Sequence, residues 1–289
     1  MKYFLKSVFI FFKTIFHIIY WLIHQIRFEN FRNYYSIVSI KNKNIAILGN
    51  GPSLKNDLDK LNNFSNYTFS VVNDFAISEQ FIKLKPLFYT LTDPAYFQEK
   101  ILVKSNQNAL DSIELVNWDM YLFIPYSSLK LFKKNRSNIF SNKYITIVPY
   151  HTSEFTVNLW IQNILYQKGL SMPRPQNVII ACIFNAINLD FEKIFLLGVD
   201  HTWTNYLIVD GENRVCFKNE HFYNSDKVTY KPFLNIWGTQ YRMHEILFDY
   251  ALMFKGYSEV ASYAEKRKVR IINFTTNSNI DSFERLIGY

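Results

Sequence analysis

The sequence predicts an α/β fold in which helices cover both faces of a mostly parallel sheet. Two observations carry this prediction. Apolar runs of strand length alternate with helix-like segments along residues 44–273. Most of these runs are apolar throughout, which is typical of parallel strands buried on both faces. The chain has 289 residues, enough for one large domain or for a domain with an insertion.

The expected elements follow one another along the chain. Residues 178–187, which are apolar except for Asn185, predict a buried helix, and residues 246–265 predict a second helix. Residues 202–242 are polar and aromatic, and this long segment predicts an inserted lid or an acceptor-binding subdomain. We expect strands at residues 44–48, 67–72, 86–91, 120–124, 145–148, 193–197 and 269–273.

A glycine-rich turn after the first expected strand is the most informative stretch of the chain. Gly49 and Gly51 permit a sharp turn and a close approach of the backbone to a ligand. Ser53 is a suitable N-cap for a helix that starts at Leu54, and the free N–H groups of a helix start attract phosphate. The spacing fits neither the dinucleotide fingerprint nor the P-loop. The turn therefore predicts a nucleotide-binding edge, with an ordinary strand-to-helix turn as the alternative.

Polar side chains gather where the expected strands end. Carboxyl ends of parallel strands lie at one edge of a sheet, and open α/β sheets bind their ligands at that edge. We therefore predict a ligand site there; the alternative for each residue is a helix cap or a turn. The residues concerned are Asn50, Asn73, Asp74, Asp93, Asp200 and His201.

Residues 3–26 predict an amphipathic helix, so residues 1–30 form a membrane-associating segment and residues 31–289 the main domain. On a helical wheel the lysines and other polar residues fall on one side, and large apolar residues fill the other. In a spanning helix Lys13 would lie near the bilayer centre, at a cost of about 2.5–3.5 kcal/mol. An in-plane helix is therefore favoured, which implies a peripheral protein at the cytoplasmic face of the inner membrane. The alternatives are a spanning helix, a signal peptide and a helix packed on the protein's own core.

Charge and cysteine content narrow the function classes. The formal net charge is +8, and residues 1–27 carry +4 of it with no acidic residue. The +4 that remains is too weak to indicate a nucleic-acid partner. Cys182 and Cys216 form neither a disulfide framework nor a zinc-ligand spacing, which suits a reducing cytosol. For the interpretation of the sequence that we favour, we expect no bound metal and no resident cofactor.

Several motifs resemble the bacterial sialyltransferases that use CMP-sialic acid, of the lipooligosaccharide sialyltransferase type. The resemblance covers roughly residues 44–280 as scattered short motifs. The same Gly-x-Gly-Pro-Ser-Leu and Gly-x-Asp-His signals are also similar to MptE-like proteins, a Rossmann-like group with a pterin diphosphokinase member. The segments that resemble the sialyltransferase motifs are residues 49–54, 72–75, 88–97, 174–177, 194–200 and 265–278.

The sialyltransferase resemblance implies a single Rossmann-like domain with a lid. It implies metal-independent, inverting transfer of a sugar from a CMP-linked donor to a surface-glycan or glycolipid acceptor. By position in the matching motifs, Asn50 and Asn73 would hold the nucleotide, and Arg174 and Asn177 the donor phosphate.

The resemblance also implies a catalytic histidine in the lid. His201, His221 and His244 match, and His244 fits best because it precedes the closing helix at about the right separation. A histidine suits the removal of a proton from an acceptor hydroxyl, and His201 would orient a substrate. Of the two tyrosines that steady the leaving phosphate in that family, the first is replaced by Thr202 and the second matches Tyr206 only incompletely.

The lid offers further contacts for an acceptor. Tyr206, His221 and Tyr223 lie in this segment, and aromatic side chains there can stack on a sugar or a base. Two other functions fit the sequence. An MptE-like phosphotransferase would bind Mg²⁺ between triphosphate oxygens through Asp93 and Asp200, and a non-catalytic scaffold in an envelope assembly would bind no nucleotide.

Overall fold

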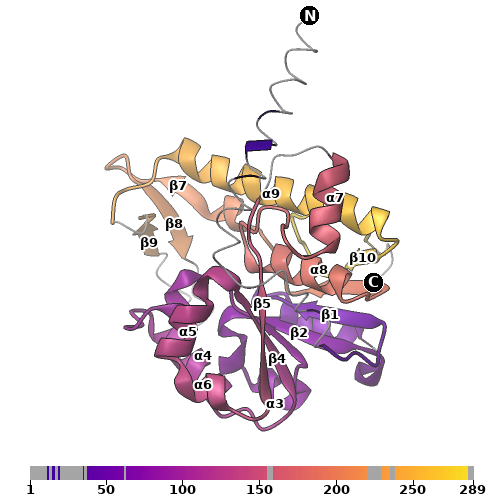
Figure 1. Ribbon diagram of the computed structural model, residues 1–289. Coiled ribbons are helices and arrows are strands. Elements are labelled where there is room, and N and C mark those ends of the chain that lie inside the picture. The colour runs from indigo at the N-terminus through magenta and orange to yellow at the C-terminus, as the bar shows by residue number, and fades with distance from the viewer. Residues whose placement is uncertain are drawn as a thin grey trace, which may run out of the picture.

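The computed structural model has a seven-stranded parallel sheet with helices on both faces (Figure 1). It describes residues 38–61, 63–154, 159–219, 229–234 and 238–285, together with Phe12, Ile15, Phe16, Ile19 and Tyr35. The strand order is β10-β6-β1-β2-β3-β4-β5, and every pair in this sheet is parallel. The predicted Rossmann-like α/β class is therefore confirmed.

The strands lie where the apolar runs predicted them. Each strand alternates its side chains between the two faces, so Ile45 and Ile47 join one core cluster while Ala46 and Leu48 join the other. The strands are β1 (Asn44–Leu48), β2 (Thr68–Val72), β3 (Phe88–Thr90), β4 (Met120–Pro125), β5 (Ile145–Tyr150), β6 (Lys193–Leu197) and β10 (Arg270–Asn273).

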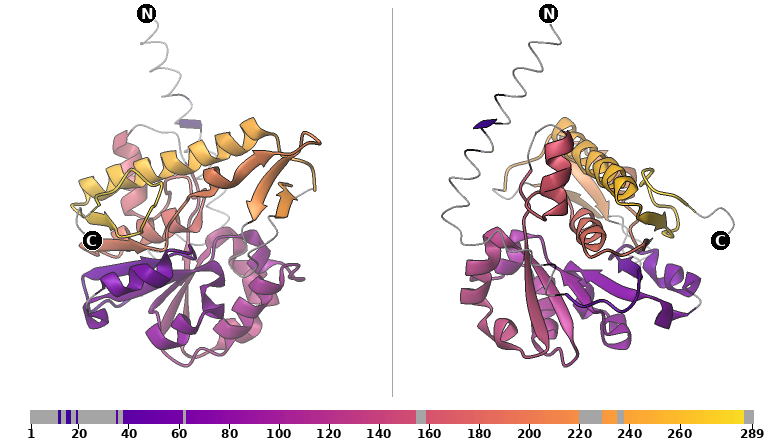
Figure 2. Two further views of the ribbon diagram at one scale, coloured as in Figure 1. Left: turned by 180° about the vertical axis from the view of Figure 1, so that it is seen from behind. Right: turned by 45° about the vertical axis from the view of Figure 1, so that its right-hand side comes forward.

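One face of the sheet is covered by α8 (Val178–Asn188), and α9 (Met243–Lys266) lies over α8, as Figure 2 shows. All residues from Val178 to Ile187 are buried because α8 lies between the strands and α9. Burial of each large aliphatic side chain contributes about 1.5–3 kcal/mol, which makes this two-helix layer a main source of stability. The helix α7 (Leu159–Gln167) lies beside it.

Shorter helices cover the opposite face. The second core cluster includes residues of α4 to α6, among them Leu110 and Phe132. The helices on this side are α2 (Leu54–Asp57), α3 (Glu79–Leu84), α4 (Lys104–Glu114), α5 (Leu129–Asn135) and α6 (Ser137–Ser141). Short 3₁₀ turns connect the elements: η2 (Leu58–Lys60), η3 (Phe64–Asn66), η4 (Asn73–Ile77), η5 (Pro94–Phe97), η6 (Tyr126–Ser128) and η7 (Trp203–Tyr206).

The predicted lid contains a small antiparallel sheet of its own, with strands β7 (Leu207–Val209), β8 (Val215–Asn219) and β9 (Thr229–Pro232). His221 and Tyr223 lie outside the described residues, as does most of the predicted N-terminal helix. Its four described residues are helical, spaced along one face, and 38–67% exposed. Within the part of the chain that the structure describes, no helix has the length and apolar character needed to span a bilayer.

Candidate functional site

The strand order reverses beside β1, and this switch point is where open α/β sheets usually bind ligands. The chain runs from β1 outward to β5 and then returns to place β6 on the other side of β1. Two loops therefore meet there, residues 49–53 after β1 and residues 198–201 after β6. The backbone N–H of Gly51 donates to the Gly198 carbonyl at 2.8 Å, which fastens the loops together.

The glycines in these loops are required by the protein's own packing. A Cβ atom on Gly49 would lie 2.4 Å from the Gly198 carbonyl oxygen, and one on Gly51 would lie 1.7 Å from Oδ2 of Asp200. Gly198 adopts a left-handed φ of +65°, a conformation that glycine adopts at little cost. The absent Cβ atoms therefore make room for the neighbouring loop, and the approach of a ligand to Gly49 and Gly51 stays a prediction.

Ser53 does not cap a helix in the expected way. Its hydroxyl makes no bond to the backbone of α2, and α2 is a single turn of four residues. Instead Ser53 Oγ lies 2.7 Å from Asp57 Oδ2 and 3.0 Å from Asp200 Oδ2, while its backbone N–H donates to Asp200 Oδ1. Ser53 therefore links two carboxylates from different loops, and the phosphate site expected at this helix start is not formed.

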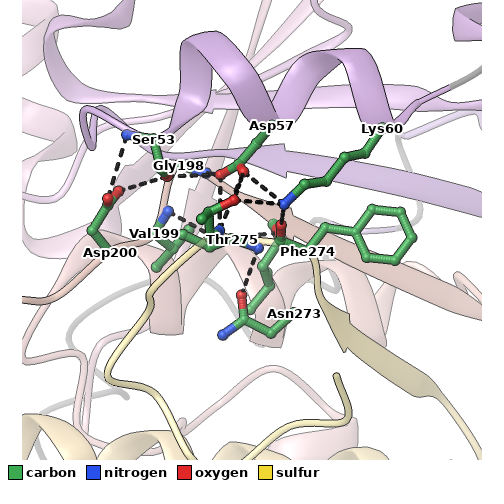
Figure 3. A network of polar contacts seen from close by, with 11 residues as sticks. Ser53, Asp57, Lys60, Gly198, Val199, Asp200, Asn273, Phe274 and Thr275 are labelled. Atoms are coloured by element: carbon green, nitrogen blue, oxygen red, sulfur yellow. Dashed lines mark hydrogen bonds and ion pairs between the residues drawn. The ribbon is translucent and has the colours of Figure 1, made fainter. Parts of the chain in front are cut away.

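Asp57, which has no predicted site role, lies at the centre of this network (Figure 3). It is fully buried and accepts hydrogen bonds from Lys60 Nζ at 2.8 Å and from Thr276 Oγ1 at 2.7 Å. The backbone N–H groups of Gly198 and Thr276 also donate to it. Asp57 and Asp59 form an Asp-x-Asp pair in sequence, but these bonds engage Asp57 inside the protein. Burial opposes its ionisation, yet the donors outweigh burial and hold the pKa of Asp57 below its ordinary value.

The pKa of Asp200 shifts in the opposite direction from that of Asp57. Burial raises the pKa of Asp200, the bonds from Ser53 oppose that rise, and the nearby Asp57 carboxylate adds to it. The single hydroxyl proton of Ser53 serves only one of the two carboxylates at a time. Asp200 therefore links the two loops through its bonds with Ser53, whereas Asp57 accepts the charged hydrogen bond from Lys60.

On the other side of β1, the amide side chains Asn50 and Asn73 lie at adjacent strand ends. Asn50 Nδ2 donates to the Val72 carbonyl at 3.2 Å, which anchors it to the end of β2. Asn73 adopts a left-handed φ of +47°, and its Oδ1 is buried with no hydrogen-bond partner among the described residues. A buried acceptor without a partner costs about 1–3 kcal/mol, so this atom is a candidate ligand contact.

The acidic residues of this edge are already engaged. Asp74 Oδ1 accepts a hydrogen bond from the Tyr96 hydroxyl at 2.6 Å, and exposed Asp93 caps η5 by accepting from the Ala95 N–H at 2.8 Å. Asp93 follows β3 whereas Asp200 follows β6, so three interstrand spacings, about 14 Å, separate the two strand ends. One Mg²⁺ ion cannot be held by both carboxylates at that separation, which corrects the predicted metal pair. Among the described residues no group of three or more His, Cys, Asp or Glu side chains lies within metal-binding reach.

His201 and Asn177 form a buried structural cluster. His201 Nε2 lies 2.5 Å from the Tyr257 hydroxyl and 3.3 Å from Asn177 Nδ2, and its ring stacks on Trp203. Burial lowers the pKa of His201 to about 3, so the ring is neutral at pH 7. Asn177 Oδ1 accepts from the N–H groups of Ile179 and Ile180, which caps α8. Asn177 is therefore the N-cap of α8, and these two N–H groups are not free for phosphate.

The remaining predicted residues lie apart from this cluster. Exposed Arg174 bonds Gln176 Oε1, and half-buried Tyr206 packs against Phe217 in the small sheet. Exposed His244 lies in the first turn of α9, 13 residues before Tyr257, which separates them by about 20 Å along the helix axis. The structure does not bring His244 next to His201, so its catalytic role stays a prediction.

A second histidine at the carboxyl edge, His151, follows an expected strand but has no partner that the sequence identifies, so it has no predicted role. It directly follows β5, is buried, and stacks on Tyr126 at a ring distance of 5.0 Å. Its Nε2 has no hydrogen-bond partner among the described residues, and burial lowers its pKa. The signal was present in the sequence, because the expected strand 145–148 ends three residues earlier. A short extension of that strand places His151 at the same edge as Asn73.

Together the sheet order and the polar strand ends define a Rossmann-like α/β protein whose polar side chains gather at the carboxyl ends of the strands. The chain belongs to the MptE-like family, described as 6-hydroxymethylpterin diphosphokinase MptE-like, whose sequence profile matches residues 22–206. The MptE-like resemblance is therefore confirmed, whereas the sialyltransferase resemblance stays a prediction.

A comparison with solved structures gives a further similarity. The MAf glycosyltransferase from Magnetospirillum magneticum AMB-1 is similar in structure, with a TM-score of 0.45 and 13% sequence identity. The match covers 86% of this chain and 34% of that one, so this chain spans about a third of its length. No curated protein matches the sequence.

Proposed function

We propose that this protein is a transferase that binds a nucleotide-activated donor along the carboxyl ends of β1 to β5. The observation that carries the proposal is the unpartnered, buried Oδ1 of Asn73 at the end of β2. A ribose hydroxyl or the amino group of a base would donate to it and remove the cost of the unmade bond. Asn50, anchored on the neighbouring strand, would contact the same nucleotide.

The donor that we propose is a CMP-linked sugar, and the acceptor a hydroxyl of a surface glycan or glycolipid. The acceptor oxygen would attack the anomeric carbon, and the bond from that carbon to the CMP phosphate oxygen would break. Amide and hydroxyl groups can stabilise the departing monophosphate. This choice of donor rests on the motif resemblance and on the amide groups at the strand ends.

We assign the role of general base to His151 ahead of His244. His151 is neutral at pH 7 because its pKa is lowered, and Nε2 has no partner among the described residues, so it can accept the acceptor proton. His244 is exposed and therefore accessible to a substrate, but it lies about 20 Å along α9 from the His201 cluster. Single substitutions to Gln distinguish the two: turnover should fall by roughly 10²–10⁴-fold for the base and stay nearly unchanged for the other.

The proposal includes attachment to the membrane surface through residues 3–26. Phe12, Ile15, Phe16 and Ile19 lie on one helical face and are exposed, as an in-plane helix requires. Flotation of the full chain with anionic vesicles tests this. Replacement of Ile15 and Ile19 by Asn should abolish flotation, and unchanged flotation would contradict the membrane role.

A second candidate function follows from the family itself. In an MptE-like diphosphokinase the hydroxymethyl oxygen would attack the β-phosphorus of ATP, the diphosphate would be transferred to that oxygen, and AMP would leave. Asp93 and Asp200 do not fit a shared Mg²⁺, so this function needs a different arrangement of phosphate contacts at the same edge.

Thermal denaturation with CMP, UDP, GDP and ATP, each with and without Mg²⁺, separates the two functions. A ligand at one hundred times its Kd stabilises the folded chain by about 2.7 kcal/mol. Stabilisation by CMP without Mg²⁺ supports the CMP-linked donor, whereas stabilisation by ATP with Mg²⁺ alone supports the diphosphokinase. No stabilisation by any nucleotide would overturn both.

Two variants locate the binding site. Asn73→Gly removes the amide but tolerates the left-handed backbone, so it should abolish nucleotide stabilisation. Asn213→Gly is the matched control because Asn213 is exposed in the lid and has a similar φ of +58°. Equal stabilisation of both variants would show that the nucleotide binds elsewhere.

A further inference from the structure

The positive charge of the main domain is concentrated in one segment. Residues 120–153 carry +5, with no acidic residue, and the basic residues are Lys130, Lys133, Lys134, Arg136 and Lys143. Residues 1–27 carry +4, which leaves the rest of the chain with a net charge of −1. The excess charge of the folded part therefore comes from this segment, which neither the sequence motifs nor the proposed transfer uses.

Three of these lysines share one face of α5. Lys130, Lys133 and Lys134 have the spacing i, i+3 and i+4, which places them on one side of a helix, and all three are exposed. Phe132 lies on the opposite side of α5 and is fully buried in the core under the helix. Like charges at this spacing repel one another and destabilise a helix, so the stability of α5 does not explain the arrangement.

The charges on this lysine face are not neutralised by the protein. None of the three lysines forms an ion pair with any of the described residues. Lys133 Nζ lies 5.0 Å from the centroid of the Phe140 ring, a contact that positions the ammonium group and leaves its charge in place. Asp111 and Glu114 of α4 accept hydrogen bonds from amide side chains instead. The face is therefore open to an external anion.

The lysine face adjoins the proposed transfer site. The helix α5 continues directly from η6, whose first residue, Tyr126, stacks on His151. Lys130 and Lys134 follow Tyr126 along continuous helical backbone, at roughly 8 and 14 Å. A chain bound along α5 would therefore reach the edge of the sheet at which His151 lies.

We propose that the lysine face of α5 binds the acceptor, and that the acceptor is an anionic glycan with carboxylate or phosphate groups. The proposal rests on the proposed transferase function and adds the charge of the acceptor to it. An exposed ammonium group is a point charge on a flexible stem, so it attracts an anion without demanding one geometry. That property suits a flexible glycan whose charges repeat along the chain.

Nucleic acid and anionic lipid fit this face less well. A protein that binds nucleic acid through its backbone neutralises many phosphates, about six to ten, and this face has three cations. Arg136, the arginine of this segment, donates to the backbone carbonyls of Tyr96 and Gln98. A bilayer is disfavoured by position, because α5 and α6 cover the face of the sheet opposite to α8 and α9. Figures 1 and 2 show the described residues of the N-terminal helix on the α9 side.

Affinity electrophoresis of the full chain in gels that contain a glycan tests the proposal. The probes are polygalacturonate, dextran phosphate and neutral dextran. We expect retardation by at least one of the two anionic glycans, weakened at high salt because salt screens exposed charges, and none by neutral dextran. The combined substitution Lys130→Gln, Lys133→Gln and Lys134→Gln should weaken binding roughly three- to a hundredfold, as the loss of three exposed ion pairs predicts.

A matched variant separates the location of the charge from its amount. Lys41→Gln, Lys168→Gln and Lys193→Gln together remove the same charge from exposed positions elsewhere and should leave the affinity nearly unchanged. Equal loss in both triple variants would overturn the proposal, as would the failure of both anionic glycans to bind. Tighter binding of duplex DNA, or flotation with anionic vesicles that depends on the α5 lysines, would also overturn it in favour of another partner.

Stabilisation by CMP distinguishes this proposal from the transferase function on which it rests. The α5 variant should be stabilised by CMP as much as the parent chain, because the substitutions lie outside the proposed nucleotide site. Failure of the acceptor proposal alone leaves that stabilisation in place, whereas failure of the transferase function abolishes it in the parent chain as well.

Discussion

Replacement of Asp57 by Asn should destabilise the whole domain, although the side chain keeps its size. Asp57 is fully buried and joins three segments: the turn after β1, the loop after β6 and the turn after β10. The amide of Asn would present a donor to groups that all donate. Lys60 would keep its charge but lose the partner at 2.8 Å.

The expected magnitude follows from the Lys60–Asp57 pair. Removal of one partner of a buried ion pair costs about 3–5 kcal/mol. Because the Lys60 side chain is 22% exposed, water can partly solvate the remaining charge, and we expect about 3 kcal/mol. For a domain of this size that corresponds to a Tm lower by roughly 6–12 °C.

Urea denaturation followed by circular dichroism measures the change. Asp59→Asn is the matched control, because Asp59 is two residues away and exposed. The double substitution Asp57→Asn with Lys60→Met should recover part of the loss, since it removes the unpaired charge. A free-energy change below about 1 kcal/mol, the value typical of a surface ion pair, would refute the reasoning.

The loss of stability caused by Asp57→Asn should itself depend on pH. The pKa of Asp57 in the folded chain lies below its ordinary value of 3.8. Its stabilising effect is therefore complete above that ordinary value and is lost as the pH falls through the folded pKa. The difference between the parent chain and Asp57→Asn should be constant near neutral pH and shrink below about pH 4. A difference that grows in acid would contradict the assignment.

Three further perturbations test the loops and the histidine cluster. Gly51→Ala places a Cβ 1.7 Å from the Asp200 carboxylate and should cost about 1–3 kcal/mol or more in overpacking, whereas Gly211→Ala, with open space around it, should be nearly neutral in the same urea assay. His201 has a pKa of about 3 in the folded chain, so between about pH 3 and pH 6.5 the unfolded chain binds more protons than the folded one. The free energy of unfolding should therefore fall as the pH decreases through this range, by up to about 1.4 kcal/mol per pH unit. His201→Asn, which tolerates the left-handed backbone, should flatten that pH profile, and an unchanged slope would assign it to other groups. Asn177→Ala should cost about 1 kcal/mol through the lost cap of α8, and no change in the denaturation midpoint would contradict the capping role.

The sequence predicted the strands well because their signal is local. After their first residues, Asn44 and Lys193, the strands β1 and β6 are apolar, and burial on both faces of a parallel sheet requires that pattern. The same reasoning placed Asn50 and Asn73 at the carboxyl edge, where the structure has them. It gave no role to His151, because no partner for its ring can be named from the sequence, whereas the structure places it directly after β5 at the same edge.

The roles of individual polar residues were less predictable, because they depend on partners distant in sequence. Ser53 has the residue type of a helix cap, but its hydroxyl bonds Asp200, 147 positions away. Asp57 looked like an ordinary acidic residue, yet Thr276, 219 positions away, donates to it. Asn177 matched a phosphate-binding position by motif, whereas its oxygen caps its own helix.

The sequence by itself determined the fold class and the edge at which polar side chains gather, because hydrophobic periodicity and the residues at strand ends are local features of the sequence. Only the tertiary structure decided what each polar group contacts. Gly49 and Gly51 allow another group to lie close to their backbone. In the structure that group is the Gly198–Asp200 loop, which lies next to them only because β6 pairs with β1. The hydrogen bonds of Asp57 likewise depend on three distant segments meeting, which no local pattern specifies.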